Sequence, residues 1–255
     1  MPQLIDIERR DRVASVTLRV PERRNALSIA LMHELIDFAR ACEVDYAIDA
    51  VVVSGGAHWF SAGNDLKDEA RWDTADRSFV EQRDIAATGF RLCKAWEEIP
   101  QITIAAVEGF AIGGGFAFAL ACDWRVLGES AHLRLPESSL GFPLTWGTIP
   151  RITALVGPAA AKRLVILGEQ VSAARALELG LADYLAADRA VLARALELAL
   201  EVTRIPPAAA RMGKEAINAL AGMFTRVASH ASADQFTLAA ASETSMQARA
   251  RALKR

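Results

Sequence analysis

The hydrophobic positions of this chain switch repeatedly between a two-residue repeat and a helical repeat, as expected when strands and helices alternate. Apolar and polar residues alternate in Leu4–Glu8 and again in Val13–Val20, which predicts a hairpin joined by a charged turn. From Ile29 to about Asp45, apolar residues recur at helical spacing. Ser28 stands just before this stretch and is a residue type that caps helix N-termini.

The middle of the chain continues this alternation. Short apolar runs predict strands at 50–53, 102–107, 124–127 and 132–135. Between the second and third of these runs, Gly113–Gly115 is followed by an apolar stretch of good helix formers. The segment from Lys67 to Asp84 is rich in charge, which predicts a mobile surface segment leading into a helix that ends near Glu98. Strands that alternate with helices indicate an α/β fold with parallel pairing.

The last part of the chain is almost entirely helical in pattern. Glycine, proline and serine residues mark the ends of the predicted helices. One helix ends at Gly157 and the next at Gly168, and a third begins after Ser172 as its N-cap and ends at Gly180. Helical spacing continues over 190–203, and 208–255 is predicted to form two helices with a break near Gly222. We therefore expect an α/β core over 1–195 and a helical C-terminal region over 196–255.

Composition narrows the classes of function. The 255 residues are 52% hydrophobic with a formal net charge of -2, which allows a large core and gives no electrostatic footprint for nucleic acid or an anionic membrane. The apolar runs are too short to span a membrane, and the charged N-terminus does not look like a secretory signal, so a cytoplasmic location is expected. The 3 cysteines and 4 histidines show neither a disulfide framework nor metal-ligand spacing.

Three loops carry the candidate chemistry. The glycines at the helix start after Ile112 leave backbone N–H groups that can bind an oxygen as it becomes anionic, or simply allow tight packing of a core helix. The loop Ala62–Asn64 is similarly small and also follows a strand, and Glu137 lies beside a proline in a loop with little other charge. Taken alone, a glycine-rich turn is usually only a turn and a loop glutamate is usually solvated. Two amides with one carboxylate would suit a thioester, because a polarised carbonyl has an acidic α-proton.

The order and spacing of these loops resemble the crotonase family, the enoyl-CoA hydratase/isomerase superfamily. The segment 60–66 matches the family's first oxyanion loop, and 109–115 with 121–123 matches the second. The segment 135–141 matches the loop that holds the catalytic glutamate, and Pro21 with 24–27 matches a loop that contacts CoA. A looser match continues to about residue 183.

This resemblance implies a crotonase-like spiral of ββα units, with C-terminal helices that build trimers or hexamers, and an acyl-CoA substrate. CoA would be part of the substrate, and no separate cofactor, metal, nucleic acid or membrane partner is expected. By resemblance, the backbone N–H groups of Asn64 and Gly114 form the oxyanion hole, and Glu137 transfers the proton. Residues expected to contact substrate are Arg23, Arg24, Ala26, Ala62, Gly63, Asp65, Leu66, Gly113, Phe142 and Trp146.

Two departures from the family pattern matter. Hydratases of this family use a second glutamate, and its position is occupied here by Ala117. One carboxylate is enough to move a proton between the α- and γ-carbons, so the sequence favours double-bond isomerisation; hydration stays open if another residue orients the water. A CoA-binding scaffold with weak catalysis also stays open. The usual basic-aromatic C-terminus is reduced to Arg249, Arg251, Lys254 and Arg255, which argues against a CoA contact from a neighbouring subunit.

Other enzyme classes lack their signatures in this chain. A dinucleotide-binding fingerprint would need a third glycine where Phe118 stands. A serine hydrolase would need a G-x-S-x-G nucleophile elbow, which does not occur.

Overall fold

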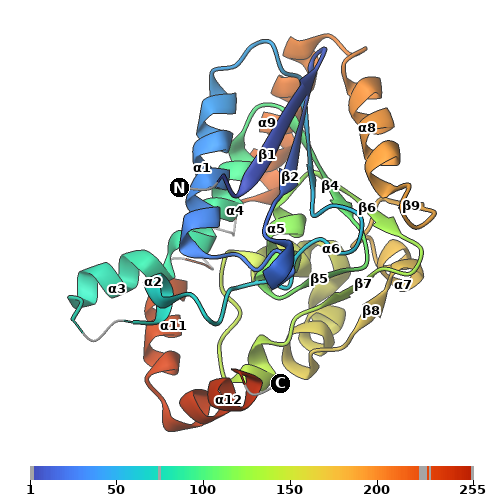
Figure 1. The fold of residues 1–255 in the computed structure, drawn as a ribbon. Coiled ribbons are helices and arrows are strands. Elements are labelled where there is room, and N and C mark those ends of the chain that lie inside the picture. The colour runs from blue at the N-terminus through green and yellow to red at the C-terminus, as the bar shows by residue number, and fades with distance from the viewer. Residues whose placement is uncertain (1–2, 74–75, 224–228, 230, 254–255) are drawn as a thin grey trace.

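The computed structural model describes residues 3–73, 76–223, 229 and 231–253. Its main sheet has six strands in the order β1-β2-β3-β4-β6-β9 (Figure 1). The hairpin β1–β2 is antiparallel, as predicted, and all other neighbours in this sheet are parallel. The strands are β1 (Ile5–Arg10), β2 (Val13–Leu18), β3 (Ala50–Ser54), β4 (Ile102–Val107), β6 (Trp124–Gly128) and β9 (Tyr184–Ala186).

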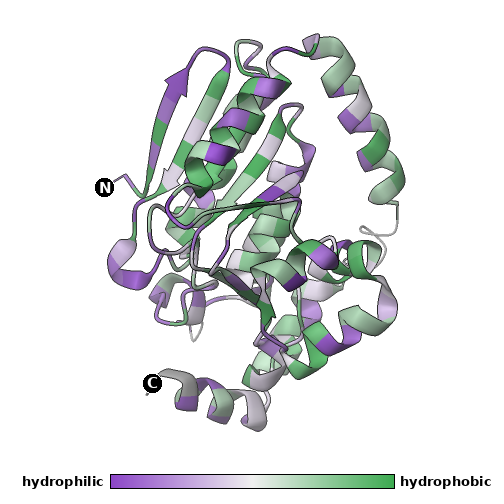
Figure 2. Ribbon diagram, turned by 90° about the vertical axis from the view of Figure 1, so that its right-hand side faces the viewer, coloured by the Kyte–Doolittle hydropathy of each residue, from purple (hydrophilic) through white to green (hydrophobic). Residues whose placement is uncertain are grey.

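Alternate residues along the central strands enter two separate hydrophobic layers. Val51 and Val53 of β3 pack with α1 (Ile29–Glu43), α4 (Thr88–Glu98) and α5 (Gly114–Ala121) on one face. Val52 packs with α8 (Val191–Val202) on the opposite face. Burial on both faces is why these parallel strands read as continuous apolar runs. The edge strand β1 instead exposes hydrophilic residues (Figure 2).

A second sheet of three strands, β5 (Phe110–Ile112), β7 (His132–Arg134) and β8 (Val171–Ser172), lies below the main sheet (Figure 1). From β4 to β7, consecutive strands alternate between the two sheets, because β4 and β6 pair in the main sheet while β5 and β7 pair in the second. A helix or helical turn follows β5 and β7. This is a repeated strand–strand–helix unit. Sequence patterns missed β5, β8 and β9, which have three, two and three residues.

The helix caps predicted from sequence are present. The Ser28 hydroxyl accepts a hydrogen bond from Leu31 N, and the Ser172 hydroxyl accepts one from Arg175 N. The helical backbone is interrupted at Gly157, where φ is 72°, as its sequence context predicted. The remaining helical segments before α8 are α2 (Glu69–Trp72), α3 (Phe79–Ala86), α6 (Thr148–Lys162), α7 (Ala173–Glu178), the short turns Pro21–Arg23 and Glu137–Leu140, and a π-helical turn at Arg163–Leu167.

The C-terminal helices return to the core. In α9 (Pro207–Ala221), Lys214 is buried and its Nζ donates to Asp123 at 2.6 Å and to the Gln101 carbonyl at 2.8 Å. Helix α9 ends before Gly222, as predicted, but the region beyond contains α11 (Ser232–Ala240) and α12 (Glu243–Leu253) instead of a single helix. The predicted division of the chain at residue 195 falls inside α8, and the role of the C-terminal region in oligomerisation stays a prediction.

The described part of the chain contains no helix with the length and apolar character needed to cross a membrane. It also contains no cluster of three or more His, Cys, Asp or Glu side chains able to hold a metal ion. All three cysteines are buried and unpaired.

Candidate active site

The three loops singled out in the sequence meet at one edge of the second sheet. Strands β5 and β7 are parallel neighbours, with Ile112 opposite Arg134, so the chain leaves both strands at the same edge. Ser61 forms a parallel bridge with Ala111 on the other side of β5. The segments that follow Ser61, Ile112 and Arg134 therefore emerge side by side, although they are far apart in sequence.

The backbone amides of Asn64 and Gly114 are neighbours. A Cβ atom placed on Gly114 would lie 3.3 Å from the amide nitrogen of Asn64, and one placed on Gly63 would lie 3.1 Å from the amide nitrogen of Gly114. Within the described residues, neither of these two N–H groups has a hydrogen-bond acceptor. Gly114 is the first residue of α5, where the helix leaves its N–H groups without internal partners. The pair can therefore donate to one ligand oxygen.

The loop that carries Asn64 is held by the segment that follows Pro21. The carbonyl of Asn25 accepts from the Ser61 hydroxyl at 2.7 Å, and the same hydroxyl accepts from Gly63 N at 3.1 Å. Leu27 N donates to the Gly63 carbonyl at 2.7 Å. The buried Asn25 side chain also donates to the carbonyls of Gly55 and Phe60. These bonds fix the direction of the Asn64 amide without occupying it.

Glu137 supplies the carboxylate. It begins the short turn Glu137–Leu140, and its Oε1 would lie 2.7 Å from a Cβ on Gly113, so the glycine leaves room for the carboxylate beside the start of α5. Its Oε2 is buried and has no hydrogen-bond partner. Burial raises the pKa of Glu137 to about 7, with a smaller opposing effect from its own backbone N–H. A carboxyl group with this pKa can accept or donate a proton at neutral pH.

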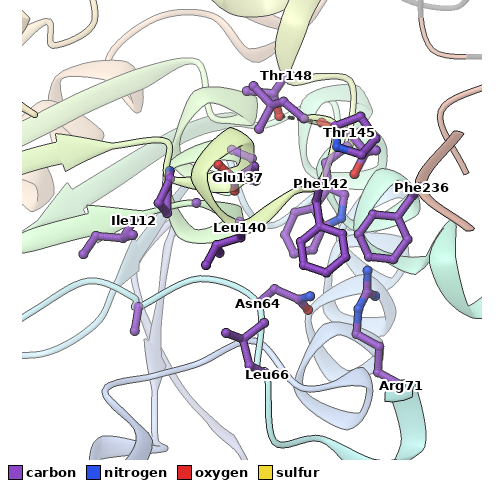
Figure 3. Close-up of a pocket in the computed structure, with 18 of the residues that line it drawn as sticks. Asn64, Leu66, Arg71, Ile112, Glu137, Leu140, Phe142, Thr145, Thr148 and Phe236 are labelled. Atoms are coloured by element: carbon purple, nitrogen blue, oxygen red, sulfur yellow. Dashed lines mark hydrogen bonds between the residues drawn. The ribbon is translucent and has the colours of Figure 1, made fainter. Parts of the chain in front are cut away.

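The two amides and Glu137 line one pocket with about 630 Å³ of empty volume, counting the space open to solvent. Figure 3 shows Glu137 on one side of the pocket and Asn64 across from it. Among the described residues that line the pocket, Glu137 and Arg71 are the only ones with ionisable side chains. Ala117 also lines the pocket, so its methyl group faces the space where a second carboxylate would act.

The structure places the residues predicted from sequence in two groups. Those that line the pocket are Ala62, Asn64, Leu66, Gly113, Gly114, Glu137, Phe142 and Trp146, together with Thr145. Those that do not line it are Arg23, Arg24, Ala26, Gly63 and Asp65. Asp65 is buried and forms an ion pair at 2.6 Å with the half-exposed side chain of Arg23. Contact of this second group with CoA stays a prediction.

Trp146 forms the wall behind the Gly114 amide. A Cβ atom on Gly89 would lie 1.8 Å from the indole ring, and a Cβ atom on Gly114 would lie 2.5 Å from it. Both positions therefore require glycine. The Trp146 carbonyl accepts from Arg151 at 2.8 Å, and Arg151 also forms two hydrogen bonds with Glu97 on α4. The buried Arg151 therefore fixes the indole against the start of α5.

Among the lining side chains that sequence analysis missed, Arg71, Trp72 and Phe236 come from outside the three loops. The sequence assigned 67–84 to a mobile surface segment, and the surface assignment is wrong for Arg71, which is 4% exposed. The ring of Phe142 stacks on Phe236 with a centroid separation of 5.1 Å and is tilted against Trp72 at 5.8 Å. A charge-dense run and a single aromatic on a distant helix contain no local signal for this cluster.

One of the basic residues near the C-terminus, Arg249, lies beside the pocket. Arg249 on α12 donates to the carbonyl of Leu66 at 3.3 Å, and its Cζ lies 3.7 Å from the centroid of the Trp72 ring. Lys254 and Arg255 lie outside the described residues.

The chain is similar to known proteins in both sequence and fold. The chain matches the sequence profile described as enoyl-CoA hydratase/isomerase over residues 8–252. It is 33% identical over 247 residues to the 2,3-dehydroadipyl-CoA hydratase of Escherichia coli (strain K12), covering 95% of this chain and 92% of that protein. It is 34% identical over 215 residues to a probable enoyl-CoA hydratase of Rhizobium meliloti, covering 83% of this chain and 80% of that protein. The solved structure of Pseudomonas aeruginosa OdaA superposes with a TM-score of 0.88 at 27% identity, covering 99% of this chain and 100% of that one.

Proposed function

The chain belongs to the enoyl-CoA hydratase/isomerase family, and we propose that it moves the double bond of an enoyl-CoA thioester through an enolate. The thioester oxygen accepts hydrogen bonds from the amides of Asn64 and Gly114. Glu137 removes a proton from the α-carbon and returns it to the γ-carbon. The double bond moves from the 3,4 to the 2,3 position, and no other reactant is consumed.

The observation that carries this proposal is a carboxylate whose buried Oε2 has no hydrogen-bond partner, beside two backbone amides without an acceptor among the described residues. They share a pocket where Ala117 contributes only a methyl group. Negative charge that develops on the thioester oxygen would meet both N–H dipoles, and each such donor is worth about 2.7–4 kcal/mol in a transition state. Proton transfer between two carbons of one substrate needs one group that alternates between base and acid. Glu137 with a pKa of about 7 suits both roles.

Hydration is the second candidate, because the relatives of this chain are named hydratases. Addition of water would require a polar group to orient the water in place of the missing second carboxylate. The side-chain oxygen of Asn64 is buried, lines the pocket and has no hydrogen-bond partner, so it is the group we assign to that role in this alternative. The side chain and the backbone amide of the same residue would then act separately.

Product analysis with 3-enoyl-CoA and 2-enoyl-CoA substrates separates the two candidates. We expect the 3-enoyl substrate to give the 2-enoyl product, and Asn64→Ala, which keeps the backbone N–H, to retain most of this activity. If 3-hydroxyacyl-CoA is the main product and Asn64→Ala loses it, hydration replaces isomerisation as the function. Binding of acyl-CoA without turnover of either substrate would instead indicate a scaffold.

The raised pKa of Glu137 predicts how the reaction depends on pH. The base must be ionised when substrate binds, so kcat/KM should be constant well above pH 7 and fall about tenfold per pH unit well below it. The measurement is a profile of initial rates from pH 5 to 9, with circular dichroism at each pH to show that the fold persists. A flat profile over this range would assign proton transfer to another group.

The remaining expectations follow from family membership. CoA enters as part of the substrate, so no separate cofactor is proposed. A homotrimer or hexamer and a cytoplasmic location stay predictions.

A further inference from the structure

Arg71 is the one cationic side chain among the described residues that line the pocket. It is 4% exposed and lies on α2, at the end of the pocket near Phe236 (Figure 3). Its Nε and Nη1 atoms are buried and have no hydrogen-bond partner. An arginine offers five N–H donors in a plane, and a carboxylate binds two of them through Nη2 together with either Nε or Nη1. A planar anionic group on either edge would therefore meet one of the two unmet donors.

The described surroundings of Arg71 include one nearby acid but no ion pair in direct contact with it. Its Cζ lies 5.1 Å from the ring centroid of Phe236 and 5.6 Å from that of Trp72, so aromatic faces provide part of its contacts. Asp68 is the acid whose charge acts on it, but the two oxygens of Asp68 already accept from the backbone amides of Ala70 and Ile29. Burial lowers the pKa of Arg71 to about 10, so it remains protonated at neutral pH.

A buried cation with unmet donors is unfavourable unless something supplies the opposite charge. The described residues contain no ion pair to Arg71. A ligand that reaches this end of the pocket with a negative charge would supply the direct counter-charge that the described residues lack. The opposite side holds Glu137, and the apolar ring of Phe142 lies between the two (Figure 3).

We infer that the substrate is the CoA thioester of a dicarboxylic acid, whose far carboxylate binds the Arg71 fork while its thioester lies on the two free amides. This inference rests on the proposed function, since it takes the thioester to lie beside Glu137. Methylene groups of the acyl chain would contact the apolar wall between the two polar ends. A bidentate arginine–carboxylate contact is both short and directional, so it would also set the register of the reacting carbons.

The test compares two 3-enoyl-CoA substrates of equal chain length, one ending in a carboxylate and one in a methyl group. For the unmodified protein we expect kcat/KM to be about 100-fold higher for the carboxylate, as for other buried charge pairs. Arg71→Met should reduce kcat/KM for the carboxylate substrate by about 100-fold and leave the methyl-terminated substrate nearly unchanged. Arg71→Lys keeps the charge but not the planar guanidinium. Its kcat/KM for the carboxylate substrate should lie between the values of the unmodified protein and of Arg71→Met.

A matched control is Arg249→Met, which removes a neighbouring cation that contacts Trp72 but does not line the pocket. It should preserve the preference for the carboxylate. Equal losses on both substrates in Arg71→Met would overturn the inference and indicate a contact with a CoA phosphate or a purely structural role. Repeating the comparison with pantetheine thioesters, which lack the nucleotide phosphates, distinguishes those two outcomes.

Binding of the saturated forms of the same two acyl-CoA molecules, measured by calorimetry, separates this inference from the proposed function. A preference for the carboxylate that Arg71→Met removes supports the inference even if neither enoyl substrate turns over. Turnover with no preference in rate or affinity supports the proposed function and rejects the dicarboxylic substrate.

Discussion

Glu137→Gln is expected to reduce turnover of enoyl-CoA by about a thousandfold while leaving CoA binding nearly unchanged. The substitution keeps the size of the side chain but removes the group that takes up the proton. Because Glu137 is the only carboxylate among the described residues that line the pocket, no neighbour can replace it. The measurement is kcat for the favoured substrate, with the affinity for a saturated acyl-CoA determined by calorimetry.

The matched control is Glu129→Gln, which removes an exposed carboxylate on the segment before β7 and should leave kcat unchanged. Undiminished turnover in Glu137→Gln would place the base on another residue. A large loss of acyl-CoA affinity would show that Glu137 acts in binding instead of proton transfer.

Glu137→Gln should also stabilise the folded protein at alkaline pH, although it reduces turnover. The pKa of Glu137 is raised by folding, so its contribution to stability is fully present below the unfolded-state pKa and declines as the pH rises through about 7. Above pH 7 the native protein therefore holds an unpaired buried charge. Glu137→Gln is expected to increase the free energy of unfolding at pH 8 by up to about 3 kcal/mol and to change it much less at pH 5. Urea unfolding at both pH values measures this difference.

Gly114→Pro has the second-largest expected effect, a loss of about 100- to 1000-fold in kcat. Proline removes the N–H that would bind the thioester oxygen. This N–H has no acceptor within the described residues, and proline is well accepted at the first position of a helix, so little is lost from the backbone itself. The rest of α5 keeps its hydrogen bonds.

The added carbon atoms create a conflict that needs a control. A Cβ on residue 114 would lie 2.5 Å from the Trp146 ring, in either proline or alanine. We therefore expect a clean comparison in a Trp146→Leu background, where Gly114→Ala retains the N–H and Gly114→Pro lacks it. The alanine variant should be at least 50-fold more active than the proline variant. Equal activity in two folded variants, checked by circular dichroism and thermal unfolding, would exclude the amide from catalysis.

Local signals in the sequence were sufficient for the long elements and for the three loops. Ser28 and Ser172 cap helices as predicted because the cap is formed by residues within one turn. The apolar runs that became β3 and β4 were recognisable because burial on both faces leaves few polar positions. The short strands β5, β8 and β9 were not, since two or three residues contain too few repeats of any pattern.

The sequence by itself determined the order of the longer elements, the helix caps, the glycine-rich loops that leave backbone N–H groups available, and the loop carboxylate Glu137. Each of these depends on residues close together in the chain. Only the tertiary structure decided that these groups share one pocket, because the parallel neighbours around β5 bring three distant loops to one edge. The tertiary structure also decided that Arg71 is a buried cation, since Phe236 on the distant helix α11 packs against its guanidinium. Contacts of that kind depend on how the C-terminal helices dock, and no local pattern of residues encodes that docking.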